Sequence, residues 1–202
     1  MNLRFLALAV IVSAVLTIVP TCYAAEPGTG FHIVRYELDL APNLQSKSVT
    51  GTEVMKFRSL RDGLGAMVFS GNALTIDSAT MNGKPVQVST GHKVISINLP
   101  ETLKQGKSGT LRISYHGIPR QGVTFTPASV YTSYAACDWM ICSEDTPGDK
   151  AIFALDLHVP AGMTSLASGK QIGKSRAKDG IEIHHWRTAI PYSAYLYNCD
   201  QY

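Results

Sequence analysis

The residues best suited to chemistry are an adjacent histidine pair and a short acidic loop. The pair is His184-His185, and the loop carries Glu144-Asp145 with Asp149 close behind. Two imidazoles bind one metal ion when they point to the same side, but neighbours on a β-strand face opposite sides of a sheet. We therefore expect one histidine to face inward and the other outward, and we predict no metal site in this chain.

The acidic loop is open to two interpretations. Glu144 and Asp145 would form a pair of carboxylates in a cleft, or Asp145 would cap the turn that Thr146-Pro147-Gly148 predicts. The second interpretation is the more economical one, because Asp side chains commonly hydrogen-bond the backbone of such turns.

An aromatic group lies just before the acidic loop. Tyr131, Tyr134 and Trp139 would either line a groove for a ligand or pack this part of the chain onto a sheet. Residues 118–150 mix aromatic residues, cysteines, Gly and Pro without a steady period, which favours a long irregular loop.

The motifs of common catalytic centres are absent from the sequence. There is no H-E-x-x-H zinc helix, no G-x-S-x-G nucleophile turn, no phosphate-binding loop and no G-x-G-x-x-G. The net charge of +3 comes without a Lys/Arg cluster, so we expect no nucleic-acid partner. Catalytic residues are therefore not predicted in this chain.

The first 24 residues have the composition of an export signal. Arg4 supplies a positive charge, an apolar run ends before Pro20, and Cys22-Tyr23-Ala24 places small residues where a signal peptidase cuts. The run is shorter than the ~20 residues of a membrane span. We predict a signal peptide at 1–24 and a secreted or periplasmic domain at 25–202 with no stable membrane span; the alternative is an uncleaved anchor.

Cleavage after Ala24 would leave three cysteines, Cys137, Cys142 and Cys199. An odd number leaves at least one thiol unpaired. In an oxidising compartment Cys137 and Cys142 could form a local disulfide, and the alternative is that they are small buried hydrophobic residues.

The elements that must position these groups are β-strands. Short runs rich in β-formers recur at intervals of about 8–12 residues, with turn residues between them. The expected strands are 32–40, 49–58, 67–69, 74–81, 86–88, 94–99, 111–117, 151–159, 163–168 and 181–188. The sequence thus predicts an all-β fold, an antiparallel two-layer saddle or sandwich of about eight or more strands.

Three pairings of these strands are expected. The first two runs should form a hairpin across the turn at Ala41-Pro42-Asn43-Leu44. Asn82-Gly83 predicts a tight hairpin turn, because both residues tolerate positive φ. The runs 163–168 and 181–188 are expected to pair with each other.

Four stretches in order carry a resemblance to a known family. They are Tyr36-Glu37-Leu38-Asp39-Leu40 with Val49-Thr50-Gly51, Leu111 to Gly117, Asp145 to Gly162, and Pro191 to Leu196. The third reads D-x-P-x-x-K-A-x-F and runs into V-P-x-G. With these motifs, the chain resembles the N-terminal β domain of zinc metallo-aminopeptidases, the family typified by aminopeptidase N and leukotriene hydrolase. The resemblance covers about residues 31–198 and implies a β saddle that packs against a thermolysin-like zinc domain.

The resemblance also implies which functional residues of the family this sequence lacks. The family's zinc helix normally follows the point where this sequence stops, at Tyr202, so we expect a domain truncated before the catalytic domain, with zinc only in the full-length family. Members often place a Gln or Glu, which binds the substrate's free amine, fourteen residues before the D-x-P proline. Counting back from Pro147 gives Ser133, which supplies neither that charge nor an amide.

Two functions follow from these observations. The first is a non-catalytic N-terminal domain, inactive alone, that covers a downstream catalytic domain and forms one wall of a peptide cleft with residues 125–150. The second is a stand-alone secreted β-sandwich module that binds a peptide or a glycan. In either case the cleft residues are predicted to be Tyr131, Ser133, Tyr134, Trp139, Glu144 and Asp145.

Overall fold

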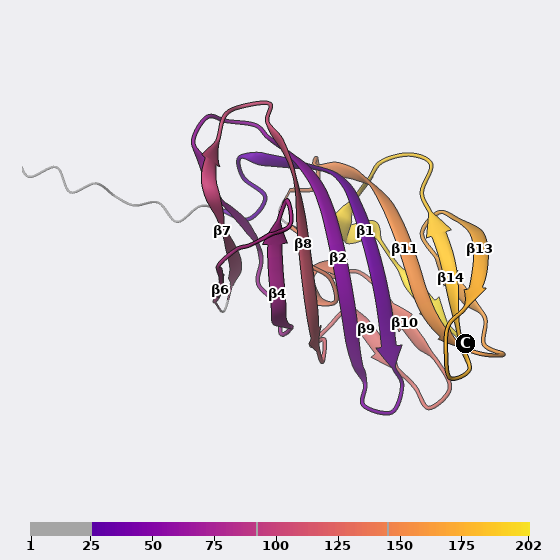
Figure 1. Cartoon of the computed structure of the whole chain (residues 1–202). Coiled ribbons are helices and arrows are strands. Elements are labelled where there is room, and N and C mark those ends of the chain that lie inside the picture. Colours follow the sequence, from indigo (N-terminus) through magenta and orange to yellow (C-terminus); the bar gives the residue numbers. More distant parts are fainter. Residues whose placement is uncertain (1–25, 92, 145) are drawn as a thin grey trace, which may run out of the picture.

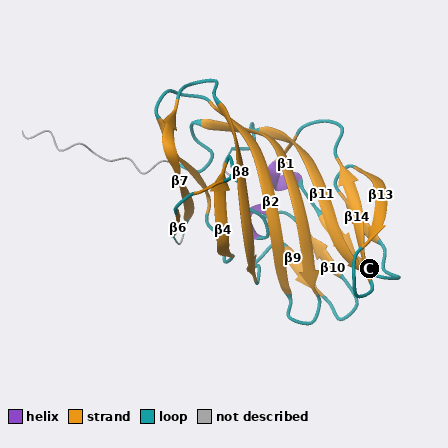
Figure 2. Cartoon of the chain, in the orientation of Figure 1, coloured by secondary structure: helices purple, strands orange, loops and turns teal. Residues whose placement is uncertain are grey.

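A computed structural model describes residues 26–91, 93–144 and 146–202, and Figure 1 shows how they are arranged. Strands dominate these residues, and the only helical turns in the described part are two short 3₁₀ segments, η1 (Ala136–Asp138) and η2 (Ala194–Leu196). Figure 2 shows the same predominance of strands. The all-β prediction is therefore confirmed. The predicted export signal at 1–24 lies outside the described residues.

A large sheet runs through the described residues and has nine strands there. Its order is β13-β14-β11-β1-β2-β8-β4-β5, and β15 pairs with β11. The bounds are β13 Lys170–Arg176, β14 Ile181–Arg187, β11 Lys150–Pro160, β1 Phe31–Asn43, β2 Ser48–Ser59, β8 Ser108–Gly117, β4 Thr75–Met81, β5 Lys84–Pro85 and β15 Tyr192–Ser193. The sheet curves across the molecule from β4 to β13 (Figure 1).

Two smaller sheets complete the described strands. The four-stranded sheet has the order β12 (Ser165–Ala167), β16 (Cys199–Gln201), β10 (Val130–Thr132) and β9 (Val123–Phe125). The three-stranded sheet has the order β3 (Leu64–Ser70), β7 (Val94–Leu103) and β6 (Val88–Thr90).

Both small sheets pack on the same side of the large sheet. Trp186 of β14 donates a hydrogen bond to the Ser165 hydroxyl of β12 at 3.1 Å, which ties the four-stranded sheet to the large one. At the other end, the rings of Phe31 on β1 and Phe69 on β3 lie with their centroids 5.3 Å apart. Burial follows the alternation of the strands, as in β2, where every second residue from Val49 on is buried.

One pairing departs from the antiparallel arrangement that we predicted. β1 and β11 run parallel, in register from Arg35↔Ile152 to Leu40↔Leu157. The large sheet is therefore mixed. Parallel neighbours need a crossover connection in place of a hairpin, and here the crossover is long: it contains β2 to β10, which contribute strands to all three sheets. Alternation along a strand does not encode the direction of its partner, so the sequence pattern could not reveal this.

The pairing of the two predicted hairpins is confirmed. β1 and β2 pair antiparallel from Phe31↔Ser59 to Asn43↔Ser48, but their turn lies at residues 44–47, because Ala41, Pro42 and Asn43 still belong to β1. Asn82 and Gly83 form the two-residue turn between β4 and β5, with φ values of 49° and 80°. Positive φ at both central residues is the geometry that matches the twist of the flanking strands.

The predicted pairing of 163–168 with 181–188 is wrong. β12 pairs with β16 in the four-stranded sheet, and β14 pairs with β11 and β13. The cause lies at Gly169, which has φ 99°; a Cβ built there would lie 2.2 Å from the carbonyl oxygen of Arg187. The chain turns sharply at this glycine and begins β13, whose polar, exposed residues gave no strand signal.

Replacement of Gly169 by Ala should destabilise the protein strongly. The added methyl group meets backbone atoms that cannot move without breaking the β13–β14 ladder, so we expect a loss of more than about 2 kcal/mol in urea unfolding. Gly83→Ala is the matched control, because Gly83 also has positive φ but its Cβ would meet no atom within 4 Å. That variant should lose about 1 kcal/mol. Equal losses would show that close approach at Gly169 is unimportant.

Candidate functional site

The predicted cleft segment divides into an exposed part and a buried part. Tyr131 and Tyr134 are 45% and 81% exposed, and Ser133 between them is also exposed, whereas Trp139 is fully buried. The predicted group of three aromatic residues is thus not brought together on one surface. Two tyrosines face solvent and the tryptophan packs in the core. Asp145 lies outside the described residues.

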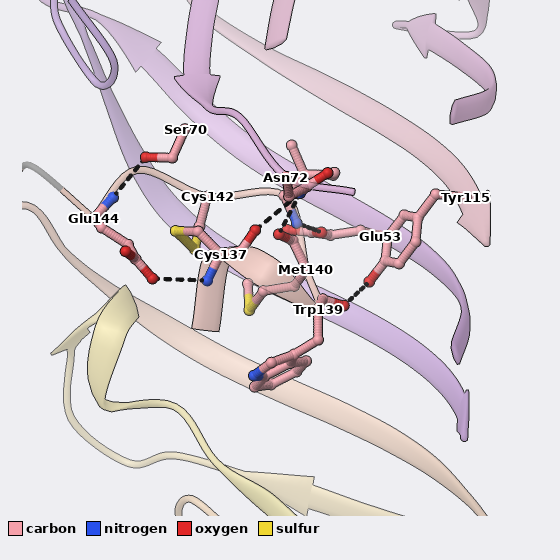
Figure 3. The surroundings of a disulfide bond; sticks show 10 residues. Glu53, Ser70, Asn72, Tyr115, Cys137, Trp139, Met140, Cys142 and Glu144 are labelled. Carbon is pink, nitrogen blue, oxygen red and sulfur yellow. Dashed lines mark hydrogen bonds between the residues drawn. A yellow bond between two sulfur atoms is a disulfide. The ribbon is translucent and has the colours of Figure 1, made fainter. Parts of the chain in front are cut away.

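A disulfide joins Cys137 to Cys142 and closes the turn that follows η1 (Figure 3). Glu144, a predicted cleft carboxylate, is held against this loop. Its Oε1 accepts a hydrogen bond from the backbone N–H of Cys137 at 3.3 Å, and its own N–H donates to the Ser70 hydroxyl at 3.1 Å. The Glu144 side chain therefore supports the disulfide loop. Cys199 is a buried free thiol in the described part of the chain.

Side chains of the large sheet and of the chain after β3 hold the backbone of this loop. Asn72 donates to the carbonyl of Cys137 at 2.8 Å, and the Tyr115 hydroxyl donates to the carbonyl of Trp139 at 3.0 Å. Oε2 of the Glu53 carboxyl group accepts from the N–H of Ile141 at 2.9 Å. Figure 3 shows these side chains converging on the loop. Buried backbone groups outside regular structure need such partners.

Glu53 is the residue that sequence analysis missed. It is fully buried, and burial raises the pKa of its carboxyl group from 4.5 to about 8, although the hydrogen bond from Ile141 opposes the shift. Burial, followed by the nearby Glu53 charge, also raises the pKa of the Tyr115 phenol. A signal was available, because Glu53 occupies an inward position in the alternation of β2 between the buried Gly51 and Met55.

The stability of the protein should fall as pH rises, through Glu53. Between pH 4.5 and about 8 the folded protein keeps a proton on Glu53 that the unfolded chain has lost, so this residue lowers the unfolding free energy by about 1.4 kcal/mol per pH unit. Urea titrations give the unfolding free energy at pH 5 and at pH 8. Between these two pH values it should fall by on the order of 3 kcal/mol more in the parent than in Glu53→Gln, whose amide oxygen still accepts from Ile141. Glu101→Gln, at an exposed site, is the control and should match the parent. Identical pH dependence in parent and Glu53→Gln would contradict the buried, protonated carboxyl.

A second feature is the outer face of the four-stranded sheet. Leu166, Asp200, Tyr131 and Thr124 are cross-strand neighbours in one row over β12, β16, β10 and β9. We call these four residues the outer row. Leu166 and Tyr131 are about half exposed, at 52% and 45%, on either side of Asp200. Partial burial raises the pKa of Asp200, whose Oδ1 accepts a hydrogen bond from the N–H of Thr132 at 3.0 Å.

The histidine pair behaves as predicted. His184 is buried and its Nδ1 lies 2.6 Å from the Ser165 hydroxyl, whereas His185 faces the other side and contacts Asp156 at 2.9 Å. Within the described residues, no three His, Cys, Asp or Glu side chains are placed to hold a metal ion. These residues therefore do not fit a zinc ion. No helix in this part of the chain is long and apolar enough to span a bilayer.

Solved structures of zinc metallopeptidases are similar in fold to this chain. The M1 zinc metallopeptidase from Deinococcus radiodurans superposes with a TM-score of 0.78 and 20% identity, over 89% of this chain and 43% of that one. A mutant of that enzyme bound to a Tyr-Ser-Ala substrate gives 0.77 and 22%, over 85% and 42%. Native yeast LTA4 hydrolase gives 0.71 and 15%, over 85% and 29%. The chain thus has the fold of a metallopeptidase β domain and spans less than half the length of these structures.

Residues 33–196 match the family model of the Peptidase M1 N-terminal domain. The chain belongs to this family. The resemblance drawn from the four sequence motifs is therefore confirmed, and it identifies the domain type that carries the outer row and the disulfide loop.

Proposed function

We propose that this chain is the non-catalytic N-terminal domain of a zinc metallo-aminopeptidase and that it docks against a catalytic domain through the outer row. The observation that carries the proposal is a pair of half-exposed large side chains, Leu166 and Tyr131, in one row of a small sheet, in a domain of this family. Apolar side chains gathered on one face are typical of a surface that a partner covers.

The chemistry of the outer row suits a protein partner. Leu166 and Tyr131 would each bury further apolar area, worth on the order of 1 kcal/mol apiece at about 25 cal/mol per Å². Asp200 between them is already partly desolvated. A cationic side chain of the partner would offset the cost of burying that carboxylate completely.

The exposed residues next to the outer row would form one wall of a peptide cleft. Ser133 and Tyr134 follow β10 directly, and Tyr134 is held at φ 42°. Neither residue carries a charge, so recognition of a substrate's free amine would come from the partner domain. Because the described residues do not fit zinc, the metal and the hydrolytic step are assigned to that partner as well.

Export of the chain is part of the same proposal. The disulfide between Cys137 and Cys142 supports a secreted or periplasmic location, because disulfides persist mainly in oxidising compartments. The alternative function, a stand-alone module for a peptide or a glycan, is less well supported. Its aromatic groove would need Trp139, which is fully buried.

The isolated chain should bind a hydrophobic dye at the outer row. Tyr131→Ser combined with Leu166→Ser should lower the fluorescence of bound 8-anilinonaphthalene-1-sulfonate, because it removes the two apolar side chains of the row. Val34→Ser with Ile172→Ser is the matched control, since those residues are 47% and 60% exposed but lie on strands of the large sheet. If both double variants reduce the fluorescence equally, or if the parent binds no dye, the docking surface lies elsewhere.

The purified chain should be inactive alone. We expect no stoichiometric zinc by elemental analysis and no hydrolysis of aminoacyl reporter substrates, because the described side chains offer no metal site. Stoichiometric zinc with turnover that a chelator abolishes would overturn the assignment of a non-catalytic domain.

A further inference from the structure

A second surface feature lies at one end of the large sheet, beside β3 of the three-stranded sheet. It is a hollow of about 630 Å³ at the end of the sheet where β1 begins and β2 ends, the upper end of these strands in Figure 1. Phe31, His32, Arg58, Leu60 and Asp149 line it. His32 and Arg58 are direct cross-strand neighbours on the face opposite to the buried Phe57, so the hollow does not overlap the outer row.

One wall of the hollow holds an oriented imidazole. Nδ1 of His32 contacts Oδ1 of Asp149, and Oδ2 of Asp149 accepts a hydrogen bond from the N–H of Ile33 at 3.3 Å. A β-bulge follows at once, between Ile33 and Arg35. Bulges of this kind re-aim side chains and are frequent beside functional sites. Since Asp149 occupies Nδ1 of His32, the remaining nitrogen, Nε2, has no partner among the described residues.

Arg58 supplies a positive charge that this part of the protein does not balance. Its side chain is exposed and makes no ion pair within the described residues, where Asp149 is already engaged by His32 and Ile33. Cross-strand neighbours lie about 5 Å apart at Cβ, so the guanidinium group and the imidazole can reach the same anion. Guanidinium groups bind carboxylates through two parallel hydrogen bonds.

The rest of the lining is partly apolar. Leu60 is 49% exposed and Phe31 is buried at the inner side, and Gly28, Thr146 and Gly148 complete the lining. A hollow of this volume, with an apolar side and a few polar groups, is of the size that holds small ligands.

We propose that this hollow binds a small carboxylate attached to an apolar group, with the apolar group against Leu60 and Phe31. The carboxylate would accept hydrogen bonds from Arg58 and, when the imidazole is protonated, from Nε2–H of His32. The ligand would be an apolar organic acid or the free C-terminus of a peptide that ends in an apolar residue. The site is independent of the outer row, so either proposal can fail without the other.

The test uses 3-phenylpropionate as the probe and follows binding to the full chain by calorimetry or by NMR shifts of His32. Binding should saturate in the micromolar to low millimolar range. Arg58→Gln should weaken it by about tenfold or more, because the charged hydrogen bonds are lost. Arg112→Gln is the matched control, an exposed arginine on the same face with no ion pair in the described residues, and should change binding by less than about twofold.

A neutral ligand of the same shape separates charge from apolar contact. 3-Phenylpropionamide should bind about tenfold more weakly than the acid, and a short peptide that ends in Phe should bind only with its C-terminus free. Peptide binding without binding of the small acid would assign the site to peptide termini. The proposal is overturned if the acid shows no saturable binding, or if Arg58→Gln unfolds at the same denaturant concentration as the parent and still binds the acid equally well.

Discussion

Irregular backbone can lie inside a protein only where its N–H and C=O groups find partners, and the loop closed by Cys137 and Cys142 depends on this constraint. The loop packs in the core, with Trp139 fully buried. Its polar groups are met by Glu53 and Tyr115 of the large sheet and by Asn72 after β3. The disulfide reduces the number of conformations that the loop can adopt, and the side-chain hydrogen bonds select one of them. This arrangement buries the carboxyl group of Glu53, and burial disfavours its charged form, which raises its pKa.

Elements that depend on local sequence patterns could be predicted, whereas strand pairings that depend on contacts between distant segments could not. Strand alternation and the Asn82-Gly83 turn are local, so β1, β2, β8, β11 and the β4–β5 turn could be placed from the sequence. The parallel β1–β11 pair and the partner of β12 depend on contacts between distant segments, which no local pattern encodes. β13 was missed because an exposed strand needs no apolar alternation, and its neighbour β14 supplies the hydrogen bonds that define it.

The candidate site was predictable only in part, for a similar reason. The aromatic residues of the segment after β9 were recognised as a group by type, but the directions of their side chains could not be predicted from a segment without a period. Tyr134 faces solvent and Trp139 is buried because Tyr134 and Ala135 both adopt left-handed conformations, with φ 42° and 46°, just before η1. Two such residues in succession reverse the chain and turn the next ones inward. Glu53, in contrast, lay in a regular strand and could have been found from its inward position.

The geometry links the outer row to the proposed cleft. Tyr131 lies on β10, and six residues later the chain reaches Cys137, where the segment held by the disulfide and by Glu53 begins. A partner that covers Tyr131 would therefore contact a strand whose continuation is already fixed, and Ser133 and Tyr134 would be presented to it without a further ordering cost. Preorganised surfaces bind more tightly because less conformational entropy is lost on association. The buried polar contacts beneath the loop thus serve the surface above it, and a change at Glu53 would be expected to loosen the cleft wall before it altered the outer row.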